Sequence, residues 1–258
     1  MTTHIVVCIK AVVTKAPRGR TVRTPENIRL NPFDLPALEA GLQIREHCGG
    51  RVTALSMGPP AGTVAMAETL AMGADKAVLA CDPAFAGADT LATATTLAAA
   101  VRTMAPVDLL LFGTRTSDSD TGQVGPQTAE ILNLPMITGV NQLRVDGDAL
   151  RVERMMDQVV SSFSIGFPAA LTIRPEAAAP REMPLEGLAE AFDHQTVDLL
   201  TLDRLDVPAD HVGEAGSPTR VASMTPVKHH RSGRMMTGTP QEMADQLVGY
   251  FFRKGLVD

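Results

Sequence analysis

Short apolar strands alternate with helical segments over the first half of the chain, and this alternation limits the possible folds more than any other feature. Strand-like runs occur at residues 4–9, 51–57, 76–80 and 108–112. Helical spacing follows at residues 33–46, 62–72, 89–104 and 122–132. Because parallel strands need long crossover connections, which are usually helices, this alternation predicts an α/β fold with a parallel sheet.

The pattern changes in the second half of the chain. Strand-like runs at residues 139–145 and 149–155 are joined by Asp146-Gly147-Asp148, and Asp-Gly between two alternating runs is a strong hairpin signal. Residues 159–165 and 169–173 continue the strand character. We therefore expect an antiparallel extension of the parallel sheet.

The C-terminal part of the chain shows little periodicity until a last helix at residues 240–254. It has little core of its own, so it is either disordered or wraps a partner, and its scattered leucines and phenylalanines favour wrapping. We expect an α/β domain at residues 1–180 and an arm at residues 181–258. A basic cluster in the arm, which is typical of a solvated loop but also compatible with an acidic partner, comprises Lys228, His229, His230, Arg231 and Arg234.

Composition excludes several classes of protein. The chain has 3% aromatic residues, no Trp and a formal net charge of −6, which argues against nucleic-acid binding by base stacking or by a basic face. No apolar stretch approaches the roughly 18 residues of a transmembrane helix, so we expect no membrane insertion. The 3 cysteines form no CxxC or metal spacing, which fits a reducing, cytoplasmic location without a metal site.

A polar, glycine-punctuated segment follows the strand at residues 108–112 and precedes the next helix. The N–H groups at such a helix start are unsatisfied and carry the positive end of the helix dipole, so they suit a phosphate. Alternatively, Asp120 or Thr121 simply caps the helix. Because Asp118 and Asp120 would repel a phosphate, we expect them to face ribose hydroxyls or to act as caps. The chain has no P-loop and no strand-linked GxGxxG motif.

Three other strand or helix ends are candidates for the same edge of the sheet. Gly58, after Met57, allows close approach of a ligand, although a plain turn explains it equally well. Pro32 is expected at the first position of a helix with Asn31 as its cap, which is more often structure than function. Cys8 ends the first strand, where a small buried core thiol is the expected role.

These motifs resemble, in order and spacing, those of the electron transfer flavoprotein beta subunit family. The resemblance covers essentially the whole chain. The motifs that carry it are Asn31-Pro32-Phe33-Asp34, Ser56-Met57-Gly58-Pro59-Pro60, Ala71-Met72-Gly73-Ala74-Asp75, the Gly113 to Gly125 loop, Val152-Glu153-Arg154, Leu171-Thr172-Ile173 and Pro180-Arg181.

The resemblance implies a Rossmann-like, adenine nucleotide hydrolase-like nucleotide-binding domain in a heterodimer with an alpha subunit that carries its own FAD. It implies an electron carrier rather than a stand-alone enzyme, with no catalytic residues. The heterodimer would relay electrons between a flavin dehydrogenase, such as an acyl-CoA dehydrogenase, and another donor or acceptor, with flavin-based bifurcation as one form of the relay.

Three further stretches resemble the Fix-type and electron-bifurcating branch of this family, namely residues 85–93, 120–126 and 216–219. That branch holds a second FAD in the beta subunit where the commoner branch holds AMP. We therefore expect FAD in this chain, with AMP as the alternative. Thr90 and Thr93 lie one helical turn apart, so their hydroxyls either share a face toward the ligand or simply cover the helix surface.

The motifs and the resemblance together nominate one set of cofactor-binding residues. It comprises Cys8, Asn31, Pro32, Phe33, Asp34, Met57, Gly58, Asp89, Thr90, Thr93, Gly113, Arg115, Thr116, Ser117, Asp118, Asp120, Thr121, Gly122, Gln123, Val124 and Gly125. For the partner dehydrogenase, the resemblance nominates Leu185 as a hydrophobic anchor. The chain departs from the family after this leucine, because residues 186–193 are acidic rather than lysine-rich.

A different class of protein has the same strand–loop–helix architecture. An adenine-nucleotide-binding sensor or stress-type protein would bind a nucleotide without any redox role. Such a self-contained sensor has no need of the long C-terminal arm, which is the feature that distinguishes the two hypotheses.

Overall fold

The computed structural model describes residues 3–14, 23–194, 196–223, 233 and 235–257. The chain divides into two compact units, Met1–Ala222 and Ser223–Asp258. The whole basic cluster in the arm, residues 228–231 and 234, lies outside the described residues. Among the helices of the described residues, none combines the length and the apolar character needed to cross a membrane.

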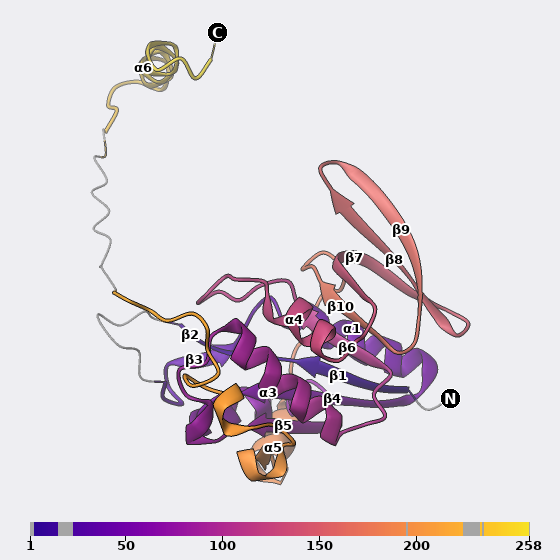
Figure 1. Cartoon of the computed structure of the whole chain (residues 1–258). Helices are drawn as coiled ribbons and strands as arrows, with labels where there is room; N and C mark the ends of the chain where they lie inside the picture. The colour runs from indigo at the N-terminus through magenta and orange to yellow at the C-terminus, as the bar shows by residue number, and fades with distance from the viewer. Residues whose placement is uncertain (1–2, 15–22, 195, 224–232, 234, 258) are drawn as a thin grey trace. The chain divides into compact units, whose positions relative to one another are not determined.

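The first unit is built on a sheet of nine strands in the described part of the chain, in the order β11-β5-β4-β1-β6-β10-β7-β8-β9 (Figure 1). From β11 to β7 every neighbouring pair is parallel, whereas β7, β8 and β9 pair antiparallel. The strands are β1 (Thr3–Cys8), β4 (Gly50–Met57), β5 (Lys76–Ala80), β6 (Leu109–Gly113), β7 (Met136–Asp146), β8 (Ala149–Met156), β9 (Val159–Gly166), β10 (Ala169–Ile173) and β11 (Asp198–Leu200). A separate antiparallel pair consists of β2 (Ala11–Val13) and β3 (Ile28–Leu30).

Helices cover both faces of this sheet. The helices of the first unit are α1 (Leu35–Cys48), α2 (Thr63–Ala71), α3 (Thr90–Thr103), α4 (Val124–Ile131) and α5 (Leu185–Asp193), with short 3₁₀ turns at Pro60–Gly62, Pro83–Phe85, Leu202–Arg204 and Ala209–His211. The second unit has helix α6 (Pro240–Arg253). Successive residues of a strand point to opposite faces, so Val7 packs in the core under α1 and α2 and Val6 in the core under α3 and α4. This arrangement confirms the predicted α/β fold.

Strand β10 corrects one part of the expectation. Instead of continuing the antiparallel extension, it returns between β6 and β7 and pairs in parallel with both. All its residues are buried, which is typical of a continuous apolar run at the centre of a parallel sheet. Only β7, β8 and β9 form the antiparallel extension.

The described residues of 181–194 and 196–222 belong to the first unit. Helix α5 packs against α2, and β11 pairs with the edge strand β5 through Leu199 and Leu79. The compact unit therefore extends beyond residue 180, to Ala222. The division at residue 180 stays a prediction about the protein bound to its partner.

The second unit contains α6. A capping box starts this helix, because the Thr239 side chain accepts from the Glu242 N–H and the Glu242 side chain accepts from the Thr239 N–H. The helix buries none of its residues, and Leu247, Val248 and Phe252 are all exposed. An amphipathic helix with no buried face has no tertiary packing of its own to stabilise it.

Candidate functional site

The order of the strands places the candidate site. Strand β1 lies between β4 and β6, and the chain moves outward on one side of β1 before crossing to the other side. In open α/β sheets, ligands bind beyond the carboxyl ends of the strands at such a switch point. Cys8, Met57 and Gly113 end β1, β4 and β6, so the nominated residues that follow them share this edge (Figure 1).

Asn31 ties the end of β1 to the loop after β6. Its backbone N–H donates to the Lys10 carbonyl at 2.9 Å, its Nδ2 donates to the Arg115 carbonyl at 2.8 Å, and its Oδ1 accepts from the Ser117 N–H at 3.2 Å. Asn31 is fully buried, so these bonds fix the loop in place. The expectation that Asn31 caps a helix with Pro32 at its first position is wrong.

Helix α1 begins three residues after Pro32, with Asp34 at its N-cap position and Pro36 in its first turn. The Asp34 side chain makes no capping bond. Its Oδ2 instead accepts from the Lys10 backbone N–H at 2.8 Å. Burial raises the pKa of Asp34 to about 7, although hydrogen bonds from Lys10, Asn31 and Gly113 partly oppose this shift.

The absence of a side chain at Gly113 allows β6 to pass directly beside Asp34. A Cβ at this position would collide with Asp34 Oδ1 and with the Phe33 carbonyl. The end of β6 therefore packs on the backbone of the 31–34 segment at a distance that only glycine permits. The end of β6 and the 31–34 segment are therefore held together at the switch point.

Salt bridges neutralise the two carboxylates of the loop. Asp118 lies 2.7 Å from Lys10 Nζ and 3.7 Å from an Arg23 nitrogen, and Asp120 lies 3.6 Å from Arg115. Partial burial opposes ionisation of Asp118, but the hydrogen bonds and charges of Lys10, Thr116 and Arg23 together outweigh it and lower the pKa. Because each carboxylate has a cationic partner, their repulsion of a phosphate is much reduced.

Neither Asp120 nor Thr121 caps helix α4, contrary to one interpretation of the loop. Gln123 occupies the N-cap position, and among the described residues no side chain makes a capping bond there. Asp120 and Gly122 take φ values of 52° and 62°, so the loop turns back before the helix begins. The first N–H groups of α4 thus lack a side-chain partner among the described residues.

Other nominated loop residues bond within the loop or stack beside it. Thr116 Oγ1 and Ser119 Oγ lie 2.9 Å apart, and the Arg115 guanidinium lies 4.4 Å from the centre of the Phe33 ring. At Gly125, a Cβ would lie 3.1 Å from the Phe112 ring. Helix α4 therefore lies close to β6, which brings its start to the sheet edge.

The start of α3 joins the same edge. Thr90 Oγ1 donates to Gln123 Oε1 at 3.2 Å, and Thr93 lies one turn further along the helix, half-buried. Asp89 caps α3 by accepting from the N–H groups of Leu91 and Ala92 at 3.0 Å. The structure therefore brings the nominated residues of α3 and of the loop before α4 together.

Hydrogen bonds connect the segment at residues 216–219 to Asp89. Thr219 donates to Asp89 Oδ2 through its N–H at 3.0 Å and through its hydroxyl at 2.6 Å. The Asp89 N–H donates to Ser217 Oγ at 2.8 Å. Burial opposes ionisation of Asp89, but the hydrogen bonds from Thr219, Ala92 and Leu91 together outweigh it and lower its pKa. Thr219 and Ser217 carried a family motif, yet nothing in their spacing indicated this contact.

The remaining strand ends fit the expectations made for them. Cys8 is buried, and burial raises the pKa of its thiol, so it stays a neutral core residue. Met57 packs on the edge of the core under α3. The Gly58 N–H donates to the Ala80 carbonyl at 3.0 Å, and the space beside its Cα is open, so both a turn and a close approach to a ligand remain compatible with its geometry.

A cavity of about 390 Å³ lies next to the loop, and it was not predicted from the sequence. Its lining comes from the loop between β6 and α4, from α4, β7, β8 and β10, and from the residue after β10, and comprises Thr114, Gly122, Pro126, Thr138, Gly139, Arg154, Met155, Met156, Thr172 and Arg174. Thr172 was the one available signal, since it interrupts an apolar strand. Its hydroxyl accepts from the Gly139 N–H at 2.7 Å.

Leu185 is set apart from these residues. It is the first residue of α5, directly after the N-cap Pro184. Its side chain is 84% exposed, which is unusual for a leucine in a folded domain and compatible with the nominated anchor role.

Known proteins share this chain's sequence over most of its length. A model of the electron transfer flavoprotein domain matches residues 21–198. The chain is 41% identical over 219 residues to the electron transfer flavoprotein subunit beta of Thermoanaerobacterium thermosaccharolyticum, which covers 85% of this chain and 84% of the relative.

Two further relatives belong to named redox systems. Subunit CarD of the caffeyl-CoA reductase-Etf complex of Acetobacterium woodii is 36% identical over 262 residues, covering 98% of this chain and 100% of the relative. Protein FixA of Azorhizobium caulinodans is 35% identical over 268 residues, covering 97% and 94%. These relatives give no support to a nucleotide sensor. The chain belongs to the electron transfer flavoprotein family, as one of its beta subunits.

Proposed function

We propose that this beta subunit binds FAD at the carboxyl ends of β1 and β6, with AMP as the alternative occupant, and pairs with an alpha subunit that carries a further FAD. In that heterodimer it takes part in electron relay between a flavin dehydrogenase, such as an acyl-CoA dehydrogenase, and another donor or acceptor. The observation that carries the proposal is the joining of three segments at one edge, through the Lys10–Asp118 and Thr90–Gln123 contacts.

The residues at this edge fit a dinucleotide. The start of α4 has no side-chain cap among the described residues, and its dipole favours a phosphate. Lys10 and Arg115 offset the charges of Asp118 and Asp120. The open space beside Gly58 leaves room for a ligand to approach the backbone.

The flavin, when bound, supplies the one- and two-electron chemistry, and the protein supplies position and electrostatics. In this chain the rigid contacts of Asn31 and Gly113 hold the loops in place. The chain has 1 Tyr and no Trp, so it has few rings to stack on a flavin. Its own contribution is therefore made by backbone amides, threonines and cations.

The start of α3 favours FAD over AMP. Asp89, Thr90 and Thr219 extend the polar edge beyond the loop that faces α4. A larger ligand uses this added surface, whereas a mononucleotide needs less of it. The names of two relatives also place them in redox systems, the caffeyl-CoA reductase-Etf complex and the FixA proteins.

Flavin content tests the proposed cofactor. We expect about two FAD for each copurified heterodimer, measured by absorbance and by extraction of the cofactors. Thr90→Val is expected to lower the content toward one FAD, because it removes the bond to Gln123 Oε1. Thr95→Val serves as the control, since among the described residues the Thr95 hydroxyl bonds only to the Leu91 carbonyl of its own helix. One FAD and one AMP for each heterodimer of the unaltered protein would contradict the proposal.

Two exposed apolar surfaces support a large protein partner. One lies on the β8–β9 hairpin and comprises Met155, Met156, Val159, Val160 and Phe163. The other is the exposed apolar face of α6 described above. Exposed apolar patches of this kind mark protein–protein contacts, and we assign both to the alpha subunit.

Charge on the apolar face of α6 is expected to weaken the heterodimer. The double variant Leu247→Asp and Phe252→Asp places two carboxylates on residues that are 42% and 55% exposed. We expect its affinity for the alpha subunit to fall by about tenfold or more, measured by titration calorimetry, with no change in the melting temperature of the first unit. The double variant Gln241→Glu and Gln246→Glu adds the same charge at polar, exposed positions, and equal losses in both would contradict the assignment.

A further inference from the structure

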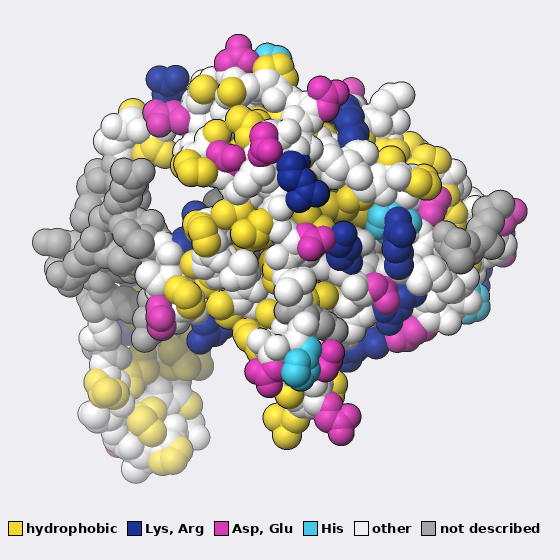
Figure 2. Space-filling model, turned by 90° about the horizontal axis from the view of Figure 1, so that it is seen from below, with side chains coloured by type: hydrophobic (Ala, Val, Ile, Leu, Met, Phe, Trp, Pro, Cys, Tyr) yellow, Lys and Arg dark blue, Asp and Glu magenta, His cyan; other side chains and the backbone are white. Residues whose placement is uncertain are grey.

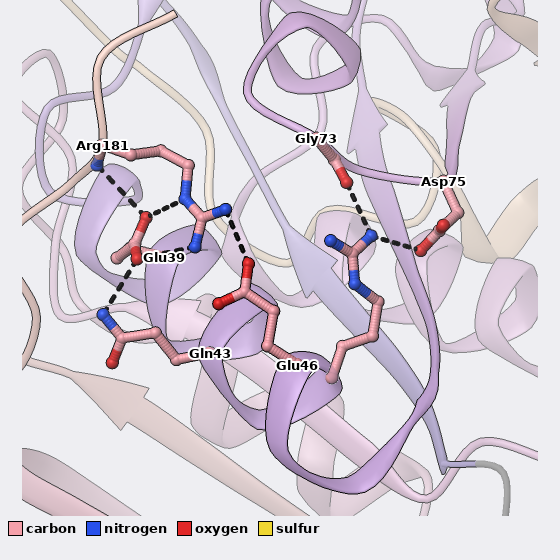
Figure 3. Close-up of polar contacts among 7 residues, drawn as sticks. Glu39, Gln43, Glu46, Gly73, Asp75 and Arg181 are labelled. Atoms are coloured by element: carbon pink, nitrogen blue, oxygen red, sulfur yellow. Dashed lines mark hydrogen bonds and ion pairs between the residues drawn. The ribbon is translucent and has the colours of Figure 1, made fainter.

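A single carboxylate holds both the backbone and the side chain of Arg181. The Arg181 N–H donates to Glu39 Oε2 at 3.1 Å, and the guanidinium donates to the two oxygens of the same carboxylate at 2.8 Å and 3.0 Å (Figure 3). A third guanidinium bond reaches Glu46 Oε1 at 2.7 Å. We call this set of contacts the Arg181 clamp.

The clamp is built into one face of helix α1. Glu39, Gln43 and Glu46 follow one another at helical spacing, so they line the same side of the helix. Gln43 Nε2 donates to Glu39 Oε1 at 2.8 Å, which leaves the buried carboxylate well satisfied. The Glu39 side chain is 5% exposed. A buried, bidentate arginine–carboxylate pair of this kind fixes geometry as well as adding energy.

The clamp holds the later part of a connecting segment whose earlier part is anchored separately, because Ala178 is buried in the core. Residues 174–184 connect β10 to α5 without helix or strand. After this segment, Gly187 seats α5 on the end of α2, because a Cβ there would lie 2.7 Å from the Ala71 carbonyl oxygen. Leu185, 84% exposed, therefore lies between two fixed points, Arg181 before it and Gly187 after it.

We propose that Arg181 is a positioning residue, which holds the segment before α5 so that Leu185 is presented to the dehydrogenase in a fixed orientation. The inference rests on the proposed function, in which Leu185 is the docking anchor. Presenting the anchor in advance lowers the ordering cost that docking would otherwise incur.

Charge patterning on the surface supports an anchor of this kind. Acidic and basic side chains are interspersed on the face shown in Figure 2, with hydrophobic side chains between them. Such a face offers no large field of one sign to steer a partner. A correctly placed apolar residue then matters more for recognition.

Helix α1 also carries a matched control. Arg45 donates to the Gly73 carbonyl at 2.7 Å and to Asp75 at 2.9 Å (Figure 3). This arginine ties the same helix to the turn between α2 and β5, and within the described part of the chain it forms no hydrogen bond or ion pair with residues 174–185. Arg45→Met therefore removes a comparable set of bonds without touching the Leu185 segment.

The test uses the flavin-loaded heterodimer and the acyl-CoA dehydrogenase of the same organism. The double variant Glu39→Gln and Arg181→Met removes the clamp without leaving a buried unpaired charge, so it is expected to fold. We expect the apparent KM for the heterodimer to rise by about tenfold, with the saturating rate and the flavin content unchanged. Arg45→Met is expected to leave the apparent KM unchanged, and Arg181→Lys to give a smaller rise.

Leu185→Ala separates this inference from the proposed function. In a double-mutant cycle, loss of the clamp should add no further rise in KM once Leu185 is truncated. An equal rise in KM with and without Leu185 would overturn the positioning role, while the docking role stands. If Leu185→Ala alone leaves KM unchanged, the docking role itself is wrong, and the positioning role is overturned with it.

Discussion

Replacing Gly113 with alanine is expected to lower the free energy of unfolding by about 3 kcal/mol or more, because the added methyl has nowhere to go. Its Cβ would meet Asp34 Oδ1 and the Phe33 carbonyl. The Phe33 carbonyl is backbone, and the Asp34 side chain is buried and held by the Lys10 N–H, so the end of β6 must move away from the 31–34 segment. We expect the variant to lose its nucleotide as well, measured by urea unfolding and by cofactor extraction.

Gly166→Ala provides the control for this prediction. Gly166 ends β9, and its Cα faces open space, so the variant is expected to stay within about 0.5 kcal/mol of the unaltered protein. If Gly113→Ala unfolds at the same urea concentration as Gly166→Ala, the close contact between β6 and Asp34 is not a feature of the folded protein.

Asp34→Asn is expected to remove a pH dependence of stability worth about 4 kcal/mol at most, at about 1.4 kcal/mol for each pKa unit. Burial raises the pKa of Asp34 from 3.8 to about 7. Between these values the folded state binds more protons than the unfolded state, so the free energy of unfolding falls as pH rises. The loss is complete above pH 7, where the variant should be more stable than the parent, measured by urea unfolding between pH 4 and 8.

Asp118→Asn is the matched control, because its pKa shift has the opposite sign. The Lys10 contact lowers the pKa of Asp118 against the effect of burial. Its contribution to stability is therefore present above the unfolded pKa and is lost as pH falls. For Asp34, the free energy of unfolding of the parent minus that of the variant should decline toward neutral pH. For Asp118, it should not. The same slope in both would show that Asp34 does not titrate inside the fold.

Local patterns in the sequence predicted most of the sheet. Strands β1, β4, β5 and β6 and the helices after them follow from apolar periodicity, because each element fits its neighbours through one buried face. The predicted position of strand β10 was wrong, because an apolar run does not determine which strands it will pair with. Its position is set by the crossover that returns it between β6 and β7.

The residues of the candidate site were nominated from the sequence, but the hydrogen bonds between them were not predicted. The Asn31-Pro32 pair has the local signature of a helix start, but bonds to Arg115 and Ser117 prevail over it. Asp89 and Thr219 are 130 residues apart in the sequence, and Glu39 and Arg181 are 142 apart. Apolar periodicity relates only residues within a few helical turns of one another. Contacts between residues so far apart in the sequence are therefore found only in the folded structure.

The two edges of the sheet differ in a way that bears on how the protein is made. Strand β11 covers the outer side of β5, whereas no described strand pairs with the outer side of β9. Strand β9 is eight residues long and exposes Val159, Val160 and Phe163, and an uncovered apolar edge is a template for aggregation. A newly synthesised beta chain is thus safest when its partner is already present, which favours production of the two subunits together.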